Sequence, residues 1–329
     1  MSKTWTPTDP SLFFSKKDSQ DLRLGDCVRS YTGNFSGLSS DLLLWGYPDH
    51  EGIALNGGRI GAAEAPKQIR TYFYKMTPHV LVRKQPQILD LGDVSLSVPL
   101  AERHNQGAVL AQLATETHLA WASVGGGHDY GYADGAGFLR AQLAKGLRPV
   151  VINFDAHLDV RPTDRGLNSG TPFHRLLLEF KDQFDFFEVG LQPQCNSQAH
   201  WDWALAQGAH LIPLAQIDIE GLLPLMQKKL HSFQGRPVWL SLDMDALRSS
   251  EAPGCSQSWT TGLKTTDIFQ LMSWMIEFFQ WKSFSIYEVS PPLDTDNRTS
   301  KLAAQFLHHY LSLQLKAGRS PEGQKEGNS

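Results

Sequence analysis

The chain has 329 residues, of which 41% are hydrophobic, and its 30 basic and 34 acidic side chains give a net charge of −4, which favours neither nucleic acid nor an anionic membrane as a partner. No apolar stretch is long enough to span a bilayer, and the first residues, MSKTWTPTDPSLFF, lack the pattern of a signal peptide. Three scattered cysteines without a C-x-x-C motif indicate neither a disulfide framework nor a zinc ribbon, so we expect a cytoplasmic protein that acts on a small molecule.

Apolar runs alternate with helical stretches along the chain, which is typical of a parallel α/β sheet. Strands are predicted at residues 41–47, 119–124, 148–154, 184–190, 210–214, 236–242 and 283–289, and several are apolar on both faces, as in strands covered by helices on both sides. Helices are predicted at 137–146, 222–233, 265–281 and 301–315. No linker divides the chain, so we expect a single domain over residues 1–315 and a disordered, polar tail over 316–329.

Side chains that can bind metals follow four of the predicted strands. In chain order they are His128, the group Asp155, His157 and Asp159, the pair Asp243 and Asp245, and Glu288. Functional groups in parallel α/β sheets collect beyond the carboxyl ends of the strands, so these residues are expected to meet. Alternate side chains of an extended chain share a face, so positions 155, 157 and 159 should point the same way, as should 243 and 245.

The charge of this cluster predicts bound cations. Four ionised aspartates packed together repel one another, and burying them unpaired is costly. Two divalent cations would neutralise them, and oxygen-rich ligands with some imidazole suit Mn²⁺. Two such ions that share a water lower its pKa and supply a hydroxide nucleophile, so we expect two Mn²⁺ per subunit and metal-assisted hydrolysis.

Each motif alone also has a simpler interpretation. The D-x-H-x-D of NFDAHLD could face solvent at a strand end, and the D-x-D of SLDMDAL could cap a helix. GGGHDYGYADG could be a flexible loop, and Glu288 could form a structural ion pair. Their joint placement, each at the end of a separate apolar strand, favours the metal-site interpretation.

The motifs GGGHD, NFDAHLD, SLDMD and YEVSP, in this order, resemble those of the arginase–agmatinase–formimidoylglutamase (ureohydrolase) family over about residues 40–315. The resemblance implies a three-layer α/β/α fold around an eight-stranded, mostly parallel sheet. It implies a pair of manganese sites formed by His128, Asp155, His157, Asp159, Asp243 and Asp245. It also implies that Glu288 receives the guanidinium or amidinium group of the substrate.

Three segments resemble the formimidoylglutamase branch of this family, namely EGIALNGGRIGAAEAP (51–66), NSGTPF (168–173) and SPPLDTDNRTSKLAA (290–304). After the D-x-D motif the chain reads DMDALRSSEAPGCSQSW, whereas arginase-like members read D-x-D-x-x-D-P-x-x-A-P-G. This branch implies hydrolysis of N-formimidoyl-L-glutamate to L-glutamate and formamide in histidine degradation. It also implies substrate contacts from Asn168 and Ser169.

A charge argument favours the same substrate. N-formimidoyl-glutamate has two carboxylates, and the guanidinium of Arg161, two positions after Asp159, matches a carboxylate and would repel the cationic far end of agmatine. Arg161 could instead pair with Asp164, and Arg59 is a further candidate for the carboxylate.

The resemblance leaves the proton donor to the leaving group open. Asp159 and Glu288 are expected to take part in catalysis, but the proton-shuttling histidine of the family aligns with Phe173, so we name its neighbour His174 as the candidate. Another ureohydrolase activity (agmatinase, guanidinobutyrase or arginase-like), a deacetylase of similar architecture, and an inactive metal-binding relative stay open as alternatives. A homo-oligomer is compatible with the sequence.

Overall fold

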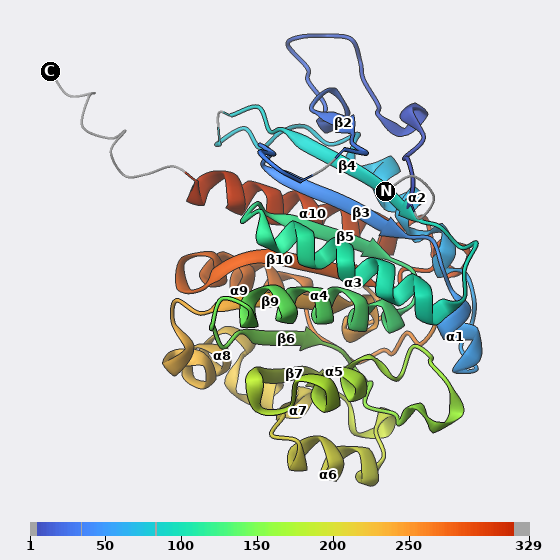
Figure 1. Cartoon of the computed structure of the whole chain (residues 1–329), viewed down its shortest axis with the longest axis vertical. Helices are drawn as coiled ribbons and strands as arrows, with labels where there is room; N and C mark the ends of the chain where they lie inside the picture. Colours follow the sequence, from blue (N-terminus) through green and yellow to red (C-terminus); the bar gives the residue numbers. More distant parts are fainter. Residues whose placement is uncertain (1–4, 34, 83, 319–329) are drawn as a thin grey trace, which may run out of the picture.

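A computed structural model describes residues 5–33, 35–82 and 84–318. They form a ten-stranded sheet, and eight of its strands pair in parallel in the order β4-β3-β5-β10-β9-β6-β7-β8 (Figure 1). The eight strands are β3 (Leu42–Tyr47), β4 (Ile88–Val94), β5 (Trp121–Gly125), β6 (Val150–Phe154), β7 (Asp185–Leu191), β8 (His210–Pro213), β9 (Pro237–Asp243) and β10 (Gln280–Tyr287). At the edge, β1 (Trp5–Thr6) pairs antiparallel with β4, and β2 (Val28–Ser30) pairs with it in parallel.

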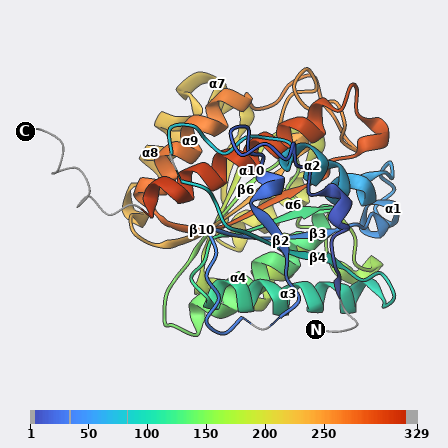
Figure 2. The ribbon, with the colours of Figure 1, turned by 90° about the horizontal axis from the view of Figure 1, so that it is seen from above.

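Helices cover both faces of the sheet, which makes three layers (Figure 2). One face carries α2 (Ala65–Phe73), α7 (Leu214–Glu220), α8 (Leu222–Leu230), α9 (Thr265–Phe278) and α10 (Arg298–Ala317). The other carries α3 (Leu100–Glu116), α4 (Gly131–Leu143), α5 (Pro172–Phe180) and α6 (Gln198–Ala206). The short helix α1 (Glu51–Leu55) contacts the turn that follows β5. The predicted three-layer fold is confirmed.

Alternation along each strand divides the apolar residues between two cores. In β3, Leu42 and Leu44 pack with the α2/α10 layer, whereas Leu43 and Trp45 pack with the α3/α4 layer. Each large aliphatic side chain buried in this way contributes about 1.5–3 kcal/mol. A strand that is buried on both faces must be apolar throughout, which is why these strands stand out in the sequence.

The predicted elements are found with shifted boundaries. All seven predicted strands are present, and the four predicted helices correspond to α4, α8, α9 and α10. The prediction of a helix over 265–281 was wrong at its end, because α9 stops at Phe278 and Trp281 lies in β10, where it is buried. The predicted tail begins too early, since α10 runs to Ala317, and residues 319–329 lie outside the described part of the chain.

The strand β4 escaped prediction because it carries two acids, Asp90 and Asp93. Both pair with the buried guanidinium of Arg70 in α2, at 2.8 Å and 2.6 Å. Such internal pairing lets a strand with charged residues occupy the sheet interior.

None of the helices in the described ranges combines the length and apolar character that a membrane span requires. The single domain over residues 1–315 stays a prediction.

Candidate metal centre

The sheet order brings the predicted ligands together. Strands β5, β10, β9 and β6 are consecutive neighbours, and each ends at the same edge of the sheet. Asp155 directly follows β6, Asp243 is the last residue of β9, and Glu288 directly follows β10. His128 begins the turn after the glycines that end β5. These side chains are buried at the carboxyl edge, where the sequence predicts them.

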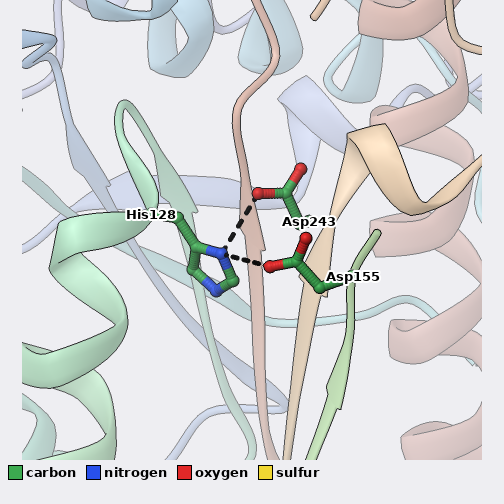
Figure 3. A group of neighbouring side chains, drawn as sticks. All are labelled: His128, Asp155 and Asp243. Atoms are coloured by element: carbon green, nitrogen blue, oxygen red, sulfur yellow. Dashed lines mark ion pairs between the residues drawn. The ribbon is translucent and has the colours of Figure 1, made fainter. Parts of the chain in front are cut away.

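A first group of ligands surrounds the Nδ1 atom of His128. This atom lies 3.0 Å from Asp155 Oδ2 and 3.1 Å from the Oδ2 atoms of both Asp159 and Asp243. Figure 3 shows His128, Asp155 and Asp243 approaching one another from three separate elements. Ligand atoms bound at about 2.1 Å and at right angles around an octahedral ion lie about 3 Å apart. The spacing within this group therefore fits one divalent cation.

A second group lies on the other side of Asp155. His157 Nδ1 is 3.3 Å from Asp155 Oδ1 and 3.3 Å from Asp245 Oδ2. The two groups satisfy the spacing for holding a metal separately, as His128, Asp155 and Asp243, and as Asp155, His157 and Asp245. Asp155 belongs to both groups and presents a different oxygen to each. A carboxylate placed in this way can bridge two cations.

Turns, not extended strands, aim these side chains. The strand β6 ends at Phe154, and the backbone N–H of His157 donates to Asp155 Oδ1 at 2.7 Å. Asp245 lies in a 3₁₀ turn, and its N–H donates to Asp243 Oδ1 at 2.8 Å. The sequence predicts that these side chains alternate as in an extended chain. Beyond β6 and β9 this prediction was wrong, because turns direct the side chains, although they do converge.

Two site residues have left-handed backbone conformations. Asp159 has φ of 48° and Glu288 has φ of 63°. This region is unfavourable for residues other than glycine, and such strain clusters at functional sites because the surrounding contacts hold it in place. For Glu288 those contacts are visible: its N–H donates to Gly126 O at 3.0 Å, and its Oε1 accepts from the N–H of His128 at 2.9 Å.

The buried negative charge of the site favours the binding of cations. Burial raises the pKa of Asp243 and Asp245 above the ordinary range, and burial together with Asp155 raises that of Asp159 to about 6. Burial would lower the pKa of His128, but the surrounding carboxylates raise it. A cluster of this kind must either take up protons or bind positive ions.

Unpartnered polar atoms indicate where the ions would sit. Asp245 Oδ1 is buried without a hydrogen-bond partner in the described residues, and His128 Nδ1 faces three carboxylate oxygens without hydrogen-bond geometry to any of them. The remaining ring nitrogen of His128 meets Ser241 Oγ at 3.0 Å, and the ring stacks on Tyr287 at 4.9 Å. These contacts fix the ring so that Nδ1 faces the carboxylates. The residues present therefore fit two divalent cations.

Four of the six candidate ligands, His157, Asp159, Asp243 and Asp245, line a cavity of about 190 Å³. Glu288 lines it, and burial raises the pKa of this carboxyl to about 8. Arg161 and Ser169, two residues for which substrate contacts are expected from the sequence, also line it. The guanidinium of Arg161 is exposed and makes no ion pair with Asp164 in the described residues, so that alternative finds no support.

Three other predicted residues lie outside the lining of this cavity. Arg59 holds a neighbouring loop, donating from Nε to Ser256 O at 2.9 Å and from Nη2 to Cys255 O at 3.0 Å. Asn168 accepts from the N–H of Gly170 at 2.9 Å and so stabilises its own turn. The His174 ring stacks on Trp203 at 4.4 Å, away from the ligands. Direct substrate contact or proton donation by these three finds no support in their placement.

Sequence reasoning missed several cavity residues, namely Asn56, Cys195, Asn196, His200 and Gln257. Asn56 could have been predicted, because it lies in the segment 51–66 that resembles the formimidoylglutamase branch. Its Nδ2 donates to Ser169 Oγ at 3.1 Å. His200 comes from α6, a helix without a clear apolar stripe that the sequence did not predict. Burial and the nearby charge of Arg161 lower the pKa of its imidazole.

Comparison with known proteins agrees with this geometry. The model of the arginase family matches residues 40–312. The formimidoylglutamase of Staphylococcus carnosus is 32% identical over 307 residues, which cover 92% of this chain and 94% of that relative. The crystal structure of formimidoylglutamase from Bacillus subtilis has a TM-score of 0.79 at 26% identity and covers 92% of this chain and 94% of its own.

A second solved structure, that of Trypanosoma cruzi formiminoglutamase with Mn²⁺, has a TM-score of 0.77 at 26% identity. It covers 91% of this chain and 100% of its own. The family match spans most of the chain, and the predicted family is confirmed. The chain belongs to the arginase family.

Proposed function

We propose that the protein is a binuclear manganese hydrolase of linear amidines, and that its substrate is N-formimidoyl-L-glutamate. The observation that carries the proposal is the pair of ligand groups that share Asp155 beside the buried carboxyl of Glu288. Relatives and solved structures named formimidoylglutamase cover more than nine tenths of the chain, and one of these structures contains Mn²⁺. The products would be L-glutamate and formamide.

One cation would be held by His128, Asp155, Asp159 and Asp243, and the other by Asp155, His157 and Asp245. The ligand set of four carboxylates and two imidazoles suits Mn²⁺ better than zinc, which prefers fewer ligands and thiolates. When bound, the pair of ions supplies Lewis acidity and lowers the pKa of water at the site. Asp159 belongs to the first ligand group, and its carboxylate would also accept the proton that the attacking water loses.

Glu288 would hold the amidinium nitrogens of the substrate. Its carboxyl is buried, and burial raises its pKa to about 8. A cationic amidine placed against it favours the ionised form, and the resulting ion pair orients the formimidoyl carbon toward the metal ligands. The hydrogen bond from the N–H of His128 fixes the position of the Oε1 atom. The same contact between Glu288 and the loop that carries His128 would therefore determine both how the substrate binds and where its reacting carbon lies.

Arg161 would bind a carboxylate of the substrate. Its guanidinium lies on the cavity wall without an ion pair in the described residues, so a ligand carboxylate would not have to displace a protein acid. Asn56, Ser169 and Gln257 line the same cavity and offer neutral hydrogen-bonding groups. A dicarboxylate substrate fits this combination, whereas the terminal ammonium of agmatine would face Arg161 with like charge.

His200 would transfer the proton that the leaving amine of glutamate requires, in the role first expected of His174. It lines the cavity, and an imidazole is the side chain that most readily gains and loses a proton near neutral pH. The other imidazole that lines the cavity, His157, belongs to the second ligand group.

We also propose a cytoplasmic location and leave a homo-oligomer as an expectation. The three cysteines are free, which is ordinary in a reducing compartment.

A substrate panel tests the proposed function. The apoprotein is loaded with Mn²⁺, and kcat/KM is measured on N-formimidoyl-L-glutamate, arginine, agmatine and 4-guanidinobutyrate. The first substrate is expected to be turned over fastest by at least tenfold. Faster turnover of a guanidino compound would assign the chain to another ureohydrolase activity. No turnover of any of the four by a metal-loaded protein would favour an inactive relative.

A further inference from the structure

A row of polar residues crosses the sheet one layer below the candidate ligands. It runs through five neighbouring strands in register, and its members are Ser123 in β5, Ser285 in β10, Ser241 in β9, Asn153 in β6 and Glu188 in β7. All five side chains are fully buried. Residues in register on parallel strands point to the same face, so the row forms one continuous surface beneath the metal centre.

Most members of this row have identifiable partners. Ser123 and Ser285 donate to the buried carboxyl of Asp134 in α4. Ser241 contacts His128, as described above. Glu188 and Asn153 differ, because Glu188 Oε2 and Asn153 Oδ1 have no hydrogen-bond partner in the described residues, whereas Glu188 Oε1 accepts one bond. A buried carboxyl with a single partner weakens the fold, so it needs a reason other than stability.

The single partner of Glu188 leads to the ligand cluster. The side-chain amide of Asn153 donates to Glu188 Oε1 at 2.7 Å and approaches Asp155 Oδ2 at 3.4 Å. An amide group has two N–H bonds, so one Nδ2 can join two carboxylates. The shorter contact, to Glu188, fixes the rotamer of Asn153, and the longer contact follows from it.

The two oxygens of Asp155 are held in different ways. Oδ1 faces His157 and accepts a backbone N–H at 2.7 Å, so the main chain holds it directly. Oδ2 faces His128, and its hydrogen-bond donor is the amide of Asn153. The position of the oxygen in the His128 group thus depends on a side chain that Glu188 orients.

We propose that Glu188 is a positioning residue that, through Asn153, holds Asp155 in the geometry that binds the cation of the His128 group. The inference rests on the proposed function, because it assumes that the two ligand groups bind metal. Residues that support metal ligands in this way typically change metal affinity by about 10- to 100-fold when they are removed. The effect should fall mainly on one of the two metals, since the main chain fixes the other oxygen of Asp155.

The test is Mn²⁺ titration of the apoprotein by calorimetry, with binding of each ion resolved. Glu188→Leu removes the acceptor and should weaken one of the two binding steps by about 10- to 100-fold. Glu188→Gln keeps an oxygen that can accept from Asn153, so its two affinities should stay within about threefold of the wild type. Equal losses in both variants would overturn the proposal and indicate a role for the charge itself.

The variant Asn153→Ala removes the same link while it leaves Glu188 in place. It should reproduce the loss, and the double variant with Glu188→Leu should lose no more than Asn153→Ala alone. Wild-type affinity in Asn153→Ala, or additive losses in the double variant, would overturn the proposal, even if Glu188→Leu does not fold. A wild-type protein that binds no Mn²⁺ would contradict the proposed function itself, which separates the two failures.

Discussion

Arg161 gives the sharpest prediction about substrate choice. Its guanidinium lines the cavity and forms no ion pair within residues 5–33, 35–82 and 84–318, so a substrate carboxylate would be its first ionic partner. A hydrogen bond to a charged group contributes about 1.5–3 kcal/mol, and exposure of this side chain argues for the lower half of that range. Since 1.4 kcal/mol corresponds to a factor of ten, Arg161→Met should raise KM for N-formimidoyl-L-glutamate by roughly 10- to 50-fold.

The maximal rate should change little, because the contact is present in both the bound substrate and the transition state. Steady-state kinetics with Arg161→Met and Arg161→Lys measure this, and lysine should recover part of the loss through its charge. Gly170→Ala is an independent perturbation, since a Cβ at this position would lie 2.6 Å from the Cδ atom of Arg161 and displace it. A KM within twofold of the wild type in Arg161→Met would refute the assigned role.

The other predictions concern proton transfer, the glycine loop and acid stability. His200→Ala should lower kcat by about 10²- to 10⁴-fold. The control His174→Ala removes an imidazole outside the cavity and should leave kcat within about threefold of the wild type. Equal effects of the two variants would exclude His200 as the proton-transfer group. Gly126→Ala places a Cβ 1.8 Å from Asp49 O, so the loop must shift. Thermal unfolding should show a loss of at least about 1–3 kcal/mol of stability, and elemental analysis should show weaker Mn²⁺ binding. Unchanged stability and metal content would show that the loop adapts. Burial holds the pKa of His308 below its ordinary 6.5, so its contribution to stability is complete above that pH and is lost as the pH falls through the lowered value. His308→Gln should therefore flatten the fall in melting temperature on acidification from about pH 6.5, and parallel curves for variant and wild type would contradict this reasoning.

The sequence predicts the strands and the sheet edge that carry the site better than it predicts the orientation of the side chains. Strands buried on both faces are apolar throughout, and the ligands come directly after them, so the edge at which they meet can be inferred from order alone. What stays hidden is how each side chain is aimed. Asp159 reaches its position through a left-handed backbone conformation, which no periodicity signals.

Elements stabilised by paired charges or by tertiary contacts also escaped prediction. The strand β4 contains two acids, Asp90 and Asp93, that become acceptable only because Arg70 pairs with them across 20 and 23 positions. The helix α6 lacks a clear apolar stripe, so His200 could not be placed near the site before the fold was known. The adjacent pair Phe173 and His174 illustrates the same limit: the ring of Phe173 packs edge-on against His128, and that of His174 turns away.

The metal content of the purified protein tests the central claim most directly. After loading and removal of free ions, elemental analysis should find two manganese ions per wild-type chain, and Asp155→Ala, which removes the shared ligand, should lose both. Asp245→Ala should lose one, because that residue belongs to a single group. Fewer than two ions in the wild type under saturating Mn²⁺, or full occupancy in Asp155→Ala, would contradict the account.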